Sequence, residues 1–216
     1  MRILIDGLDL TGKSTLVREL TSTLNERGIP ARDHRWMLSR IQPFAARLRR
    51  LPRVRQPDSG FITAALLGPG YLLDGLLVRL SPPDRSDQVI IQEGYADRCV
   101  AFGMASGPHL AACLAVRWPR LLAPFDLAIY LHAPVETRAK RLAIRDDADA
   151  NDRRTVEDPS FAATFNTTLV RGVGRRHTHL RIYDTSLRSA ADIASEIAAE
   201  VAHRIQPTPV AHPQAA

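Results

Sequence analysis

The 216-residue sequence predicts an α/β fold of three layers, in which a five-stranded parallel sheet carries helices on both faces. Two observations favour this class. Short apolar runs alternate along the chain with longer stretches in which a leucine or isoleucine recurs every fourth residue. The first apolar run also ends in a glycine-rich turn that opens directly into one of these periodic stretches. The composition, 45% hydrophobic and 24% charged, is typical of a globular domain and excludes wholly disordered, collagen-like and coiled-coil chains.

The predicted strands are short and apolar, and they are spread over the whole chain. The run Val89-Ile90-Ile91 is the clearest, because β-branched residues favour strands. The strand after residue 30 is the weakest, since its residues are mixed in polarity. The five predicted strands are residues 2–5, 31–36, 88–92, 126–132 and 180–183.

The predicted helices fill the stretches between these strands. The first has Leu16, Leu20 and Leu24 on one face, and Gly28 ends it. The apolar stretch 61–80 contains two charged residues and the triplet Gly68-Pro69-Gly70, so we expect two buried helical pieces separated at the triplet, and no membrane span. The other predicted helices are residues 13–26, 96–106, 109–122, 134–145, 160–170 and 189–205.

Two polar segments lack any core pattern. Residues 146–158 are rich in acids and are expected to form a mobile loop that acts as a lid. Residues 206–216 contain three prolines and are expected to be a disordered tail. Residues 1–205 then form a single domain. Two cysteines are too few for a disulfide scaffold and fit a reducing compartment, so we expect a cytoplasmic protein.

The strongest motif follows the first strand. Residues 7–14, Gly-Leu-Asp-Leu-Thr-Gly-Lys-Ser, match the G-x-x-x-x-G-K-[ST] pattern of a phosphate-binding loop. Glycines let backbone N–H groups point at phosphate oxygens, the lysine reaches the β- and γ-phosphates, and the serine offers its hydroxyl to Mg²⁺. Lysine is rare here, since only Lys13 and Lys140 accompany 27 arginines. The motif predicts binding of ATP and Mg²⁺ by Gly7, Leu10, Thr11, Gly12, Lys13, Ser14 and Thr15.

Other classes of P-loop protein fit less well. A GTPase requires an N-K-x-D motif, and Lys140 is followed by Arg141. A motor ATPase would end its third strand in Asp-Glu, whereas this strand ends in Gln92-Glu93. A small phosphotransferase is therefore favoured.

The segment Asp6-Gly7-Leu8-Asp9 through Lys13-Ser14-Thr15 resembles the start of the thymidylate kinases, which read E-G-x-D-x-x-G-K-[ST]-T. Looser similarities follow at residues 93–103, 126–145 and 184–186, so the resemblance covers about residues 2–205. It implies a P-loop kinase fold and transfer of the γ-phosphoryl group of ATP to a nucleotide- or nucleoside-like acceptor. Because members of this family often form dimers, it also implies a possible homodimer.

The departures from this family lie on the acceptor side. Gly94 stands where the family has the arginine that holds the acceptor's phosphate, so either Arg98 replaces it or the acceptor lacks that phosphate. Residues 35–38 are Arg-Trp-Met-Leu in place of R-E-P-G, and residues 66–72 lack the base-reading Phe and Arg. We therefore expect an acceptor other than thymidylate.

The resemblance and the chemistry of phosphoryl transfer together assign candidate roles. Glu93, at the end of the third strand, is expected to hold Mg²⁺ together with Ser14, or to accept a proton from the attacking hydroxyl. Because Leu10 puts no charge in the loop, a cation from the lid is expected to stabilise the transferred group. The candidate cations are Arg145, Arg153 and Arg154, with Arg141 beside the donor; the candidate acceptor-binding residues are Asp9, Tyr95, Asp97 and Arg98.

Three alternatives stay open. The acceptor is a hydroxyl group on a non-nucleotide metabolite, or the protein is a non-catalytic regulator that only binds ATP. The third is a nucleic-acid binder, suggested by a net charge of +6 and by the arginine cluster at residues 40–55. This last class is disfavoured, because Phe44 is the only aromatic residue in the cluster. The expected partner is a small-molecule acceptor.

Overall fold

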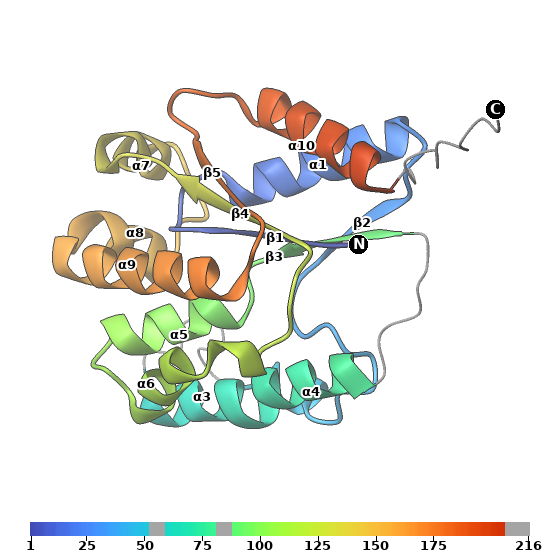
Figure 1. Cartoon of the computed structure of the whole chain (residues 1–216). Coiled ribbons are helices and arrows are strands. Elements are labelled where there is room, and N and C mark those ends of the chain that lie inside the picture. Colours follow the sequence, from blue (N-terminus) through green and yellow to red (C-terminus); the bar gives the residue numbers. More distant parts are fainter. Residues whose placement is uncertain (52–58, 81–87, 206–216) are drawn as a thin grey trace, which may run out of the picture.

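The computed structural model describes residues 1–51, 59–80 and 88–205, and the tail predicted at residues 206–216 lies outside them. A five-stranded sheet runs through the middle, with the strand order β2-β3-β1-β4-β5 and every neighbouring pair parallel (Figure 1). Its strands are β1 (Arg2–Gly7), β2 (Ala31–His34), β3 (Val89–Glu93), β4 (Leu127–His132) and β5 (Leu180–Asp184). The predicted fold class is confirmed.

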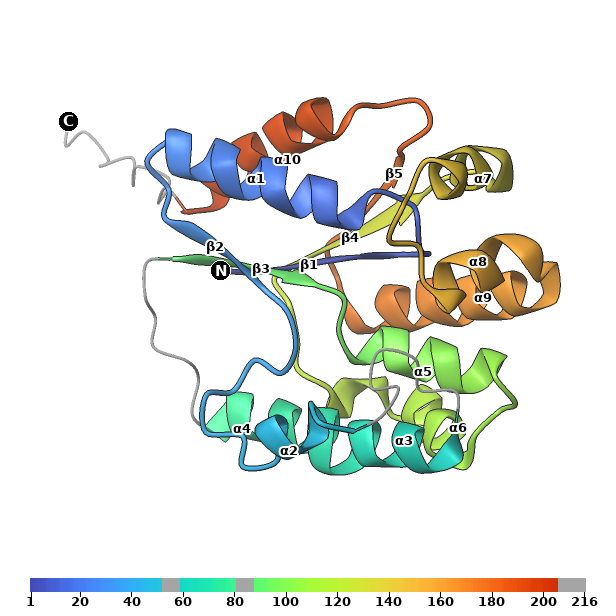
Figure 2. The same cartoon turned by 180° about the vertical axis from the view of Figure 1, so that it is seen from behind.

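Helices cover both faces of the sheet. On one face lie α1 (Lys13–Glu26) and α10 (Ala190–Ile205); on the other lie α5 (Ala96–Ala105) and α9 (Pro159–Arg176) (Figures 1 and 2). Outside α5 a further set of helices is packed. That set contains α2 (Ala45–Leu48), α3 (Gly60–Ala65), η1 (Leu66–Leu72), α4 (Leu73–Leu80), α6 (Leu110–Arg117) and η2 (Pro119–Leu121). Two helices, α7 (Val135–Ala143) and α8 (Ala150–Glu157), lie at the carboxyl end of the sheet.

The central strand β1 is buried on both faces, as expected for a parallel sheet. Ile3 and Ile5 point into the core beneath α1 and α10, whereas Leu4 points into the core beneath α5 and α9. In register, Ile3 lies between Ile91 of β3 and Leu127 of β4. The end of β1 is thereby held rigidly between two strands, and the phosphate-binding motif follows directly from it.

The stretch 60–80 is continuous, so the predicted break at the Gly-Pro-Gly triplet is wrong. Pro69 cannot donate a backbone hydrogen bond, and the chain accommodates it by widening into the π-helical segment η1. The side chain of Gln42 donates to the carbonyl oxygens of Pro69, at 3.0 Å, and Gly70, at 2.9 Å. This tertiary contact gives both carbonyl groups a side-chain partner and ties the wide turn to the segment before α2.

Among the described residues, Gly60–Leu80 is the one helical stretch that is long and apolar enough to cross a membrane. Half of it is buried inside the protein, against α5 and α6. This burial is typical of a core helix.

The loop predicted at 146–158 contains the helix α8, so the prediction of an irregular loop is wrong there. Asp149 begins the helix: its carboxylate accepts hydrogen bonds from the backbone N–H groups of Asn151 and Asp152, while the Asp152 side chain accepts from the N–H of Asp149. The acidic residues that make the segment polar therefore also cap it.

Two helix boundaries also differ from prediction. The helix predicted at 109–122 ends at Arg117, because Pro119 cannot continue it and starts the 3₁₀ turn η2 instead. The helix predicted at 160–170 extends to Arg176. Its additional two turns cross α5 and bury Val173.

Candidate active site

The turn after β1 has the backbone of a phosphate-binding loop. Gly7 has φ 153°, and a Cβ atom there would lie 2.4 Å from the carbonyl oxygen of Leu131. Gly12 has φ 90° and begins α1 in the left-handed region. Both positions require glycine, and the resulting curl directs the start of α1 at the space above the loop.

Lys13 is folded back over this loop. Its ammonium group donates to the carbonyl oxygens of Gly7, at 3.0 Å, and Leu8, at 2.6 Å, and lies 3.7 Å from the Asp9 carboxylate. Burial and the nearby Arg98 lower its pKa, against the opposing effect of Asp9. The one cation among residues 7–14 is thus held against the backbone of the loop.

Arg141 of α7 fastens the loop to the end of the sheet. Its guanidinium donates to the carbonyl oxygen of Leu10, at 2.8 Å, and to the hydroxyl and carbonyl oxygens of Thr185, at 3.0 and 2.8 Å. Thr185 in turn donates to the carbonyl oxygen of Thr11, at 2.9 Å. The structure therefore brings Arg141 to the loop, as predicted, and adds Thr185, which the sequence resemblance indicated only as part of a closing segment.

Ser14 and Glu93 meet because α1 starts, and β3 ends, at the same edge of the sheet. The Ser14 hydroxyl donates to the Glu93 carboxylate at 2.6 Å. The other carboxylate oxygen forms an ion pair with Arg35 at 2.7 Å. Arg35 follows β2, and no sequence signal had assigned it a role. A hydroxyl and a carboxylate this close fit Mg²⁺, which takes few protein oxygens and completes its shell with water and phosphate.

Asp9, the acidic residue within the phosphate loop, is paired with Arg98 of α5. The two are 2.5 Å apart, and Arg98 also donates to the carbonyl oxygen of Gly7 at 3.0 Å. Burial opposes the charge on Asp9, but Arg98 and Lys13 still hold the pKa of Asp9 below its usual value. The second Asp9 oxygen is buried and accepts no hydrogen bond within the described residues.

Asp6 lies directly under the loop and is fully buried. One of its carboxylate oxygens accepts from the backbone N–H of Gly7 at 2.8 Å, and the other has no hydrogen-bond partner among the described residues. Burial raises the pKa of Asp6 to about 6, although Arg98 and Lys13 act in the opposite direction.

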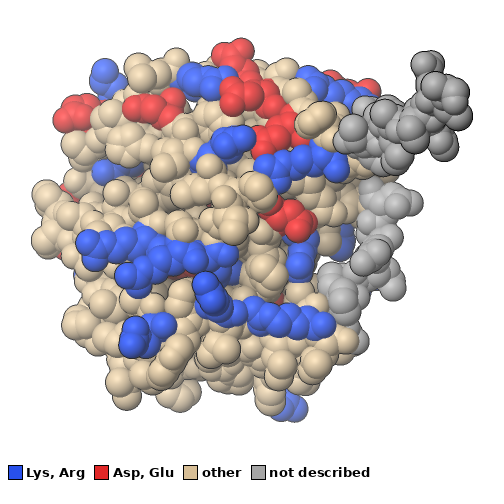
Figure 3. Space-filling model, in the orientation of Figure 1, with Lys and Arg blue, Asp and Glu red and all other residues tan. Residues whose placement is uncertain are grey.

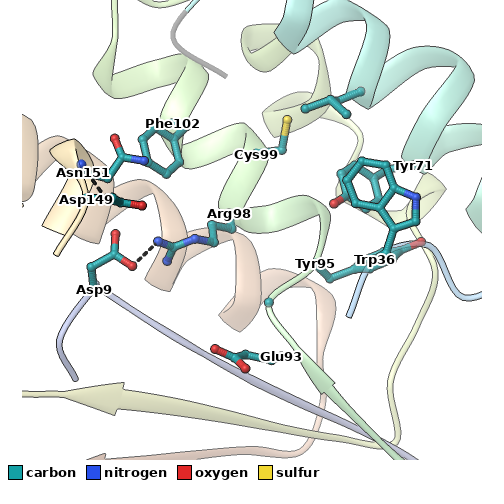
Figure 4. Close-up of a pocket in the computed structure, with 12 residues that line it drawn as sticks. Asp9, Trp36, Tyr71, Glu93, Tyr95, Arg98, Cys99, Phe102, Asp149 and Asn151 are labelled. Carbon is teal, nitrogen blue, oxygen red and sulfur yellow. Dashed lines mark hydrogen bonds and ion pairs between the residues drawn. The ribbon is translucent and has the colours of Figure 1, made fainter. Parts of the chain in front are cut away.

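A cavity of about 270 Å³ opens beside the loop, and we call it the acceptor pocket (Figure 4). One wall is aromatic: the rings of Trp36 and Tyr71 are 6.3 Å apart, and those of Tyr71 and Tyr95 are 4.8 Å apart, both edge to face. Asp9, Glu93 and Arg98 lie at the end nearest the loop. The other lining residues are Leu66, Gly94, Cys99, Phe102, Asp149 and Asn151.

The aromatic wall is held by Asp74, which is completely buried on α4. Its carboxylate accepts hydrogen bonds from the Tyr95 hydroxyl and from the backbone N–H groups of Leu38 and Ser39. The chain after β2 is thereby fixed against α4, and Trp36 takes a left-handed backbone with φ 101°. Sequence reasoning missed Trp36, Tyr71 and Asn151 as lining residues, because these contacts join segments far apart in the chain.

A second cavity of about 360 Å³ lies over the phosphate loop, and we call it the donor pocket. It is lined by Leu10, Gly12, Lys13, Ser14 and Thr15 of the loop region, together with Arg141, Arg145 and Asp152. Three carboxylates, those of Asp9, Glu93 and Asp149, line both cavities. The two cavities therefore meet at one acidic boundary.

The lid arginines separate in the structure. Arg145 lines the donor pocket and forms an ion pair with Asp147 at 2.8 Å. Arg153 is exposed, and the guanidinium of Arg154 lies 3.9 Å from the ring centre of Phe161. Neither of the latter two lines either cavity.

Asp97 is also absent from the acceptor pocket. Its carboxylate forms a buried ion pair with Arg176 of α9, on the other side of α5. The helical period explains this, because residues 98, 99 and 102 occupy the face of α5 that the pocket uses. Of the predicted acceptor-binding residues, Asp9, Tyr95 and Arg98 line the pocket.

Comparison with known proteins gives structural matches alone. No protein-family model and no curated protein matches the sequence. A thymidylate kinase from Candida albicans is similar with a TM-score of 0.62 and 15% identity, over 94% of this chain and 91% of that one. A deoxyadenosine kinase from M. mycoides, solved with the products dCMP and a flexible dCDP, is similar with a TM-score of 0.58 and 14% identity, over 94% and 100%. This chain therefore has the fold of the thymidylate kinase-like P-loop kinases.

Proposed function

We propose that the protein is a Mg²⁺-dependent phosphotransferase that moves the γ-phosphoryl group of ATP to a nucleoside- or nucleotide-like small molecule. The observation that carries this proposal is the meeting of the donor and acceptor pockets at Asp9, Glu93 and Asp149. Phosphoryl transfer requires the attacking and leaving oxygens to lie on opposite sides of the phosphorus. Two cavities that adjoin over a phosphate-binding loop support such an arrangement.

Residues of the loop would hold the donor. The Lys13 ammonium, which contacts two backbone carbonyls and Asp9, would exchange these contacts for the β- and γ-phosphates. Ser14 and Glu93 would hold Mg²⁺, which when bound neutralises charge on the phosphates. Arg145 is the lid cation best placed to reach the transferred group, since it already lines the donor pocket.

The acceptor end supports a hydroxyl nucleophile. Three carboxylates and one guanidinium line the acceptor pocket, and that guanidinium, on Arg98, is already paired with Asp9 and a backbone carbonyl. This arrangement disfavours a phosphomonoester, because no guanidinium that lines the pocket is left free to pair with its phosphate. Within the proposed class we therefore favour an unphosphorylated nucleoside-like acceptor. Glu93 would take the proton of its hydroxyl, and the free oxygen of Asp9 would accept a hydrogen bond from a second hydroxyl.

The aromatic wall suits a flat ring. Trp36 and Tyr71 offer apolar ring surface, while the amide of Asn151 and the hydroxyl of Tyr71 make no side-chain hydrogen bond within the described residues. A planar acceptor with a polar edge would use both. An aliphatic hydroxylated metabolite would leave these polar groups without partners, at a cost in affinity.

The test is transfer of labelled γ-phosphate from ATP and GTP to nucleosides, nucleoside monophosphates and hydroxylated metabolites. We expect transfer to a nucleoside, and loss of transfer in Lys13→Ala. Lys140→Gln is the matched control. Lys140 is exposed on α7, and its substitution removes the same charge away from the loop. Transfer to thymidylate at a higher rate would contradict the charge argument. Tight ATP binding without transfer to any acceptor would favour the non-catalytic alternative.

The lid gives a second test that separates catalysis from binding. If α8 and Arg145 close over the donor, Arg145→Gln lowers kcat at least about tenfold and changes ATP affinity much less. A protein that only binds ATP would tolerate the change without consequence.

We also propose that the protein is a cytoplasmic homodimer. Large apolar side chains are exposed on the outer helices, among them Phe61 at 75%, Leu110 at 75% and Trp118 at 55%. Because α3 and α6 pack side by side, exposed side chains of this size on them support a proposed interface. Light scattering should give twice the mass of the chain, and Leu110→Arg/Trp118→Arg should give the single mass.

A further inference from the structure

A third cavity lies on the side of α5 that faces away from the acceptor pocket. It has a volume of about 230 Å³ and is bounded by α5, α6, η2 and α9; we call it the back cavity. Helix α5 separates the two sites, since Cys99 and Phe102 line the acceptor pocket while Val100 and Met104 line the back cavity. The proposed phosphotransfer uses none of the residues that line the back cavity.

One half of the back cavity is apolar and the other is basic. Val100, Met104, Val116 and Leu122 supply apolar surface from α5, α6 and the segment after η2. Opposite them, α9 supplies two hydroxyls, of Thr167 and Thr168, and two guanidinium groups, of Arg171 and Arg175. A cavity with this division fits a ligand that has an apolar body and an anionic end.

The basic half carries charge that the protein does not neutralise. Arg171 and Arg175 are four residues apart on one helix, an unfavourable spacing for like charges, and neither contacts a carboxylate among the described residues. Within α5, α6, η2 and α9, Asp97 is the one acidic residue, and Arg176 already neutralises it. Figure 3 shows basic side chains running across the middle of this face, with most acidic ones above them.

The floor of the back cavity depends on Gly172. A Cβ atom at this position would lie 3.2 Å from the Asp97 carboxylate, a tighter contact than most side chains make. Glycine therefore leaves room above Asp97 on the α5 side of the cavity. Arg171 and Arg175, one turn apart on α9, both line the cavity.

We infer that the back cavity is a binding site for a small aromatic phosphomonoester. The ring lies against Val100, Met104 and Val116, and the phosphate lies between Arg171 and Arg175. Arginine is suited to this contact because its planar fork of N–H donors matches phosphate oxygens. Bound there, the ligand touches the helix that also carries Arg98.

Methionine methyl groups report on this site directly. The chain has three methionines. Met104 lines the back cavity, whereas Met37 packs against Gly70 of η1 and serves as an internal reference. The full-length protein, labelled with ¹³C at these methyls, would be titrated with 1-naphthyl phosphate in the presence of saturating ATP. We expect a saturable shift of the Met104 signal. Inorganic phosphate and 1-naphthol, which each lack one half of the ligand, should bind at least about tenfold more weakly.

A charge variant with a matched control assigns the phosphate contact. Arg171→Gln/Arg175→Gln should lower the affinity for 1-naphthyl phosphate at least about tenfold, measured by titration of the Met104 signal. Arg18→Gln/Arg181→Gln removes two exposed charges from the other side of the protein and should leave the affinity unchanged. An unshifted Met104 signal, equal binding of 1-naphthol, or equal affinity of both double variants would overturn the inference. Because the readout is binding at Met104, it does not depend on whether phosphotransfer occurs.

Discussion

The ion pair between Asp97 and Arg176 offers the sharpest test of how this fold is held together. The sequence resemblance made Asp97 a candidate for acceptor binding. In the structure its side chain is buried and 3% exposed, and that of Arg176 is 2% exposed. Arg176 also donates to the carbonyl oxygen of Ala123 and lies 5.7 Å from the ring centres of Tyr95 and Phe125. We therefore predict that Asp97 acts on stability and not directly on the acceptor.

The magnitude follows from burial. Asp97→Ala leaves the buried Arg176 guanidinium without its counter-ion, and such changes cost about 3–5 kcal/mol. The double variant Asp97→Ala/Arg176→Met removes both charges, so it should recover part of this loss. The exposed pair of Arg188 and Glu196, with side chains 39% and 49% exposed, serves as a control. Breaking it by Glu196→Gln should cost less than about 1 kcal/mol.

Urea unfolding, monitored by circular dichroism, measures the parent and the three variants. Because the whole domain is stabilised by only about 5–15 kcal/mol, the single variant should lose a large fraction of its unfolding free energy. A loss below about 1 kcal/mol for Asp97→Ala, together with a raised KM for the acceptor, would refute the reasoning. Asp97 would then be a substrate residue, as the resemblance implied.

Three further predictions concern the phosphate loop and its surroundings. Lys13→Ala should reduce phosphoryl transfer by at least about a hundredfold, measured as kcat with ATP, because its charge is the one cation inside the loop. Glu93→Gln keeps the contact to Ser14 but removes both the base and the carboxylate proposed to hold Mg²⁺, so kcat should fall by about 10²–10⁴. Burial raises the pKa of Asp6 to about 6, so the folded state keeps a proton that the unfolded state loses near pH 4. The free energy of unfolding should therefore fall as the pH rises from about 4 to 6. Asp6→Asn should therefore be more stable than the parent at pH 7.5, by up to about 3 kcal/mol, and equally stable at pH 4 in urea titrations.

Local patterns were sufficient for the five strands, for most of the helices and for the phosphate loop. The period of four in the first helix and the β-branched run at 89–91 are set by neighbouring residues, so they can be read without the rest of the chain. The phosphate loop lies within eight consecutive residues, and its glycines are required by backbone angles that no other residue adopts easily. Predictions failed where a distant side chain decides, as Gln42 does for the turn at Pro69.

The acceptor half of the site exists only in the folded chain. Trp36, Tyr71 and Tyr95 come from three separate segments, and they share a wall because buried Asp74 joins the chain after β2 to α4 and α5. The direction of each α5 side chain is likewise fixed by packing, which turns Arg98 to the acceptor pocket and Asp97 to α9.

The sequence by itself determined the sheet, the helices around it and the phosphate-binding loop, because periodicity and glycine spacing are local properties. The tertiary structure alone decided which of the many arginines reach the site. The direction of a guanidinium group depends on how its helix packs, and that packing cannot be read from the local sequence. It also decided the charge of the acceptor pocket, since that charge depends on which acids and bases are brought together and already paired.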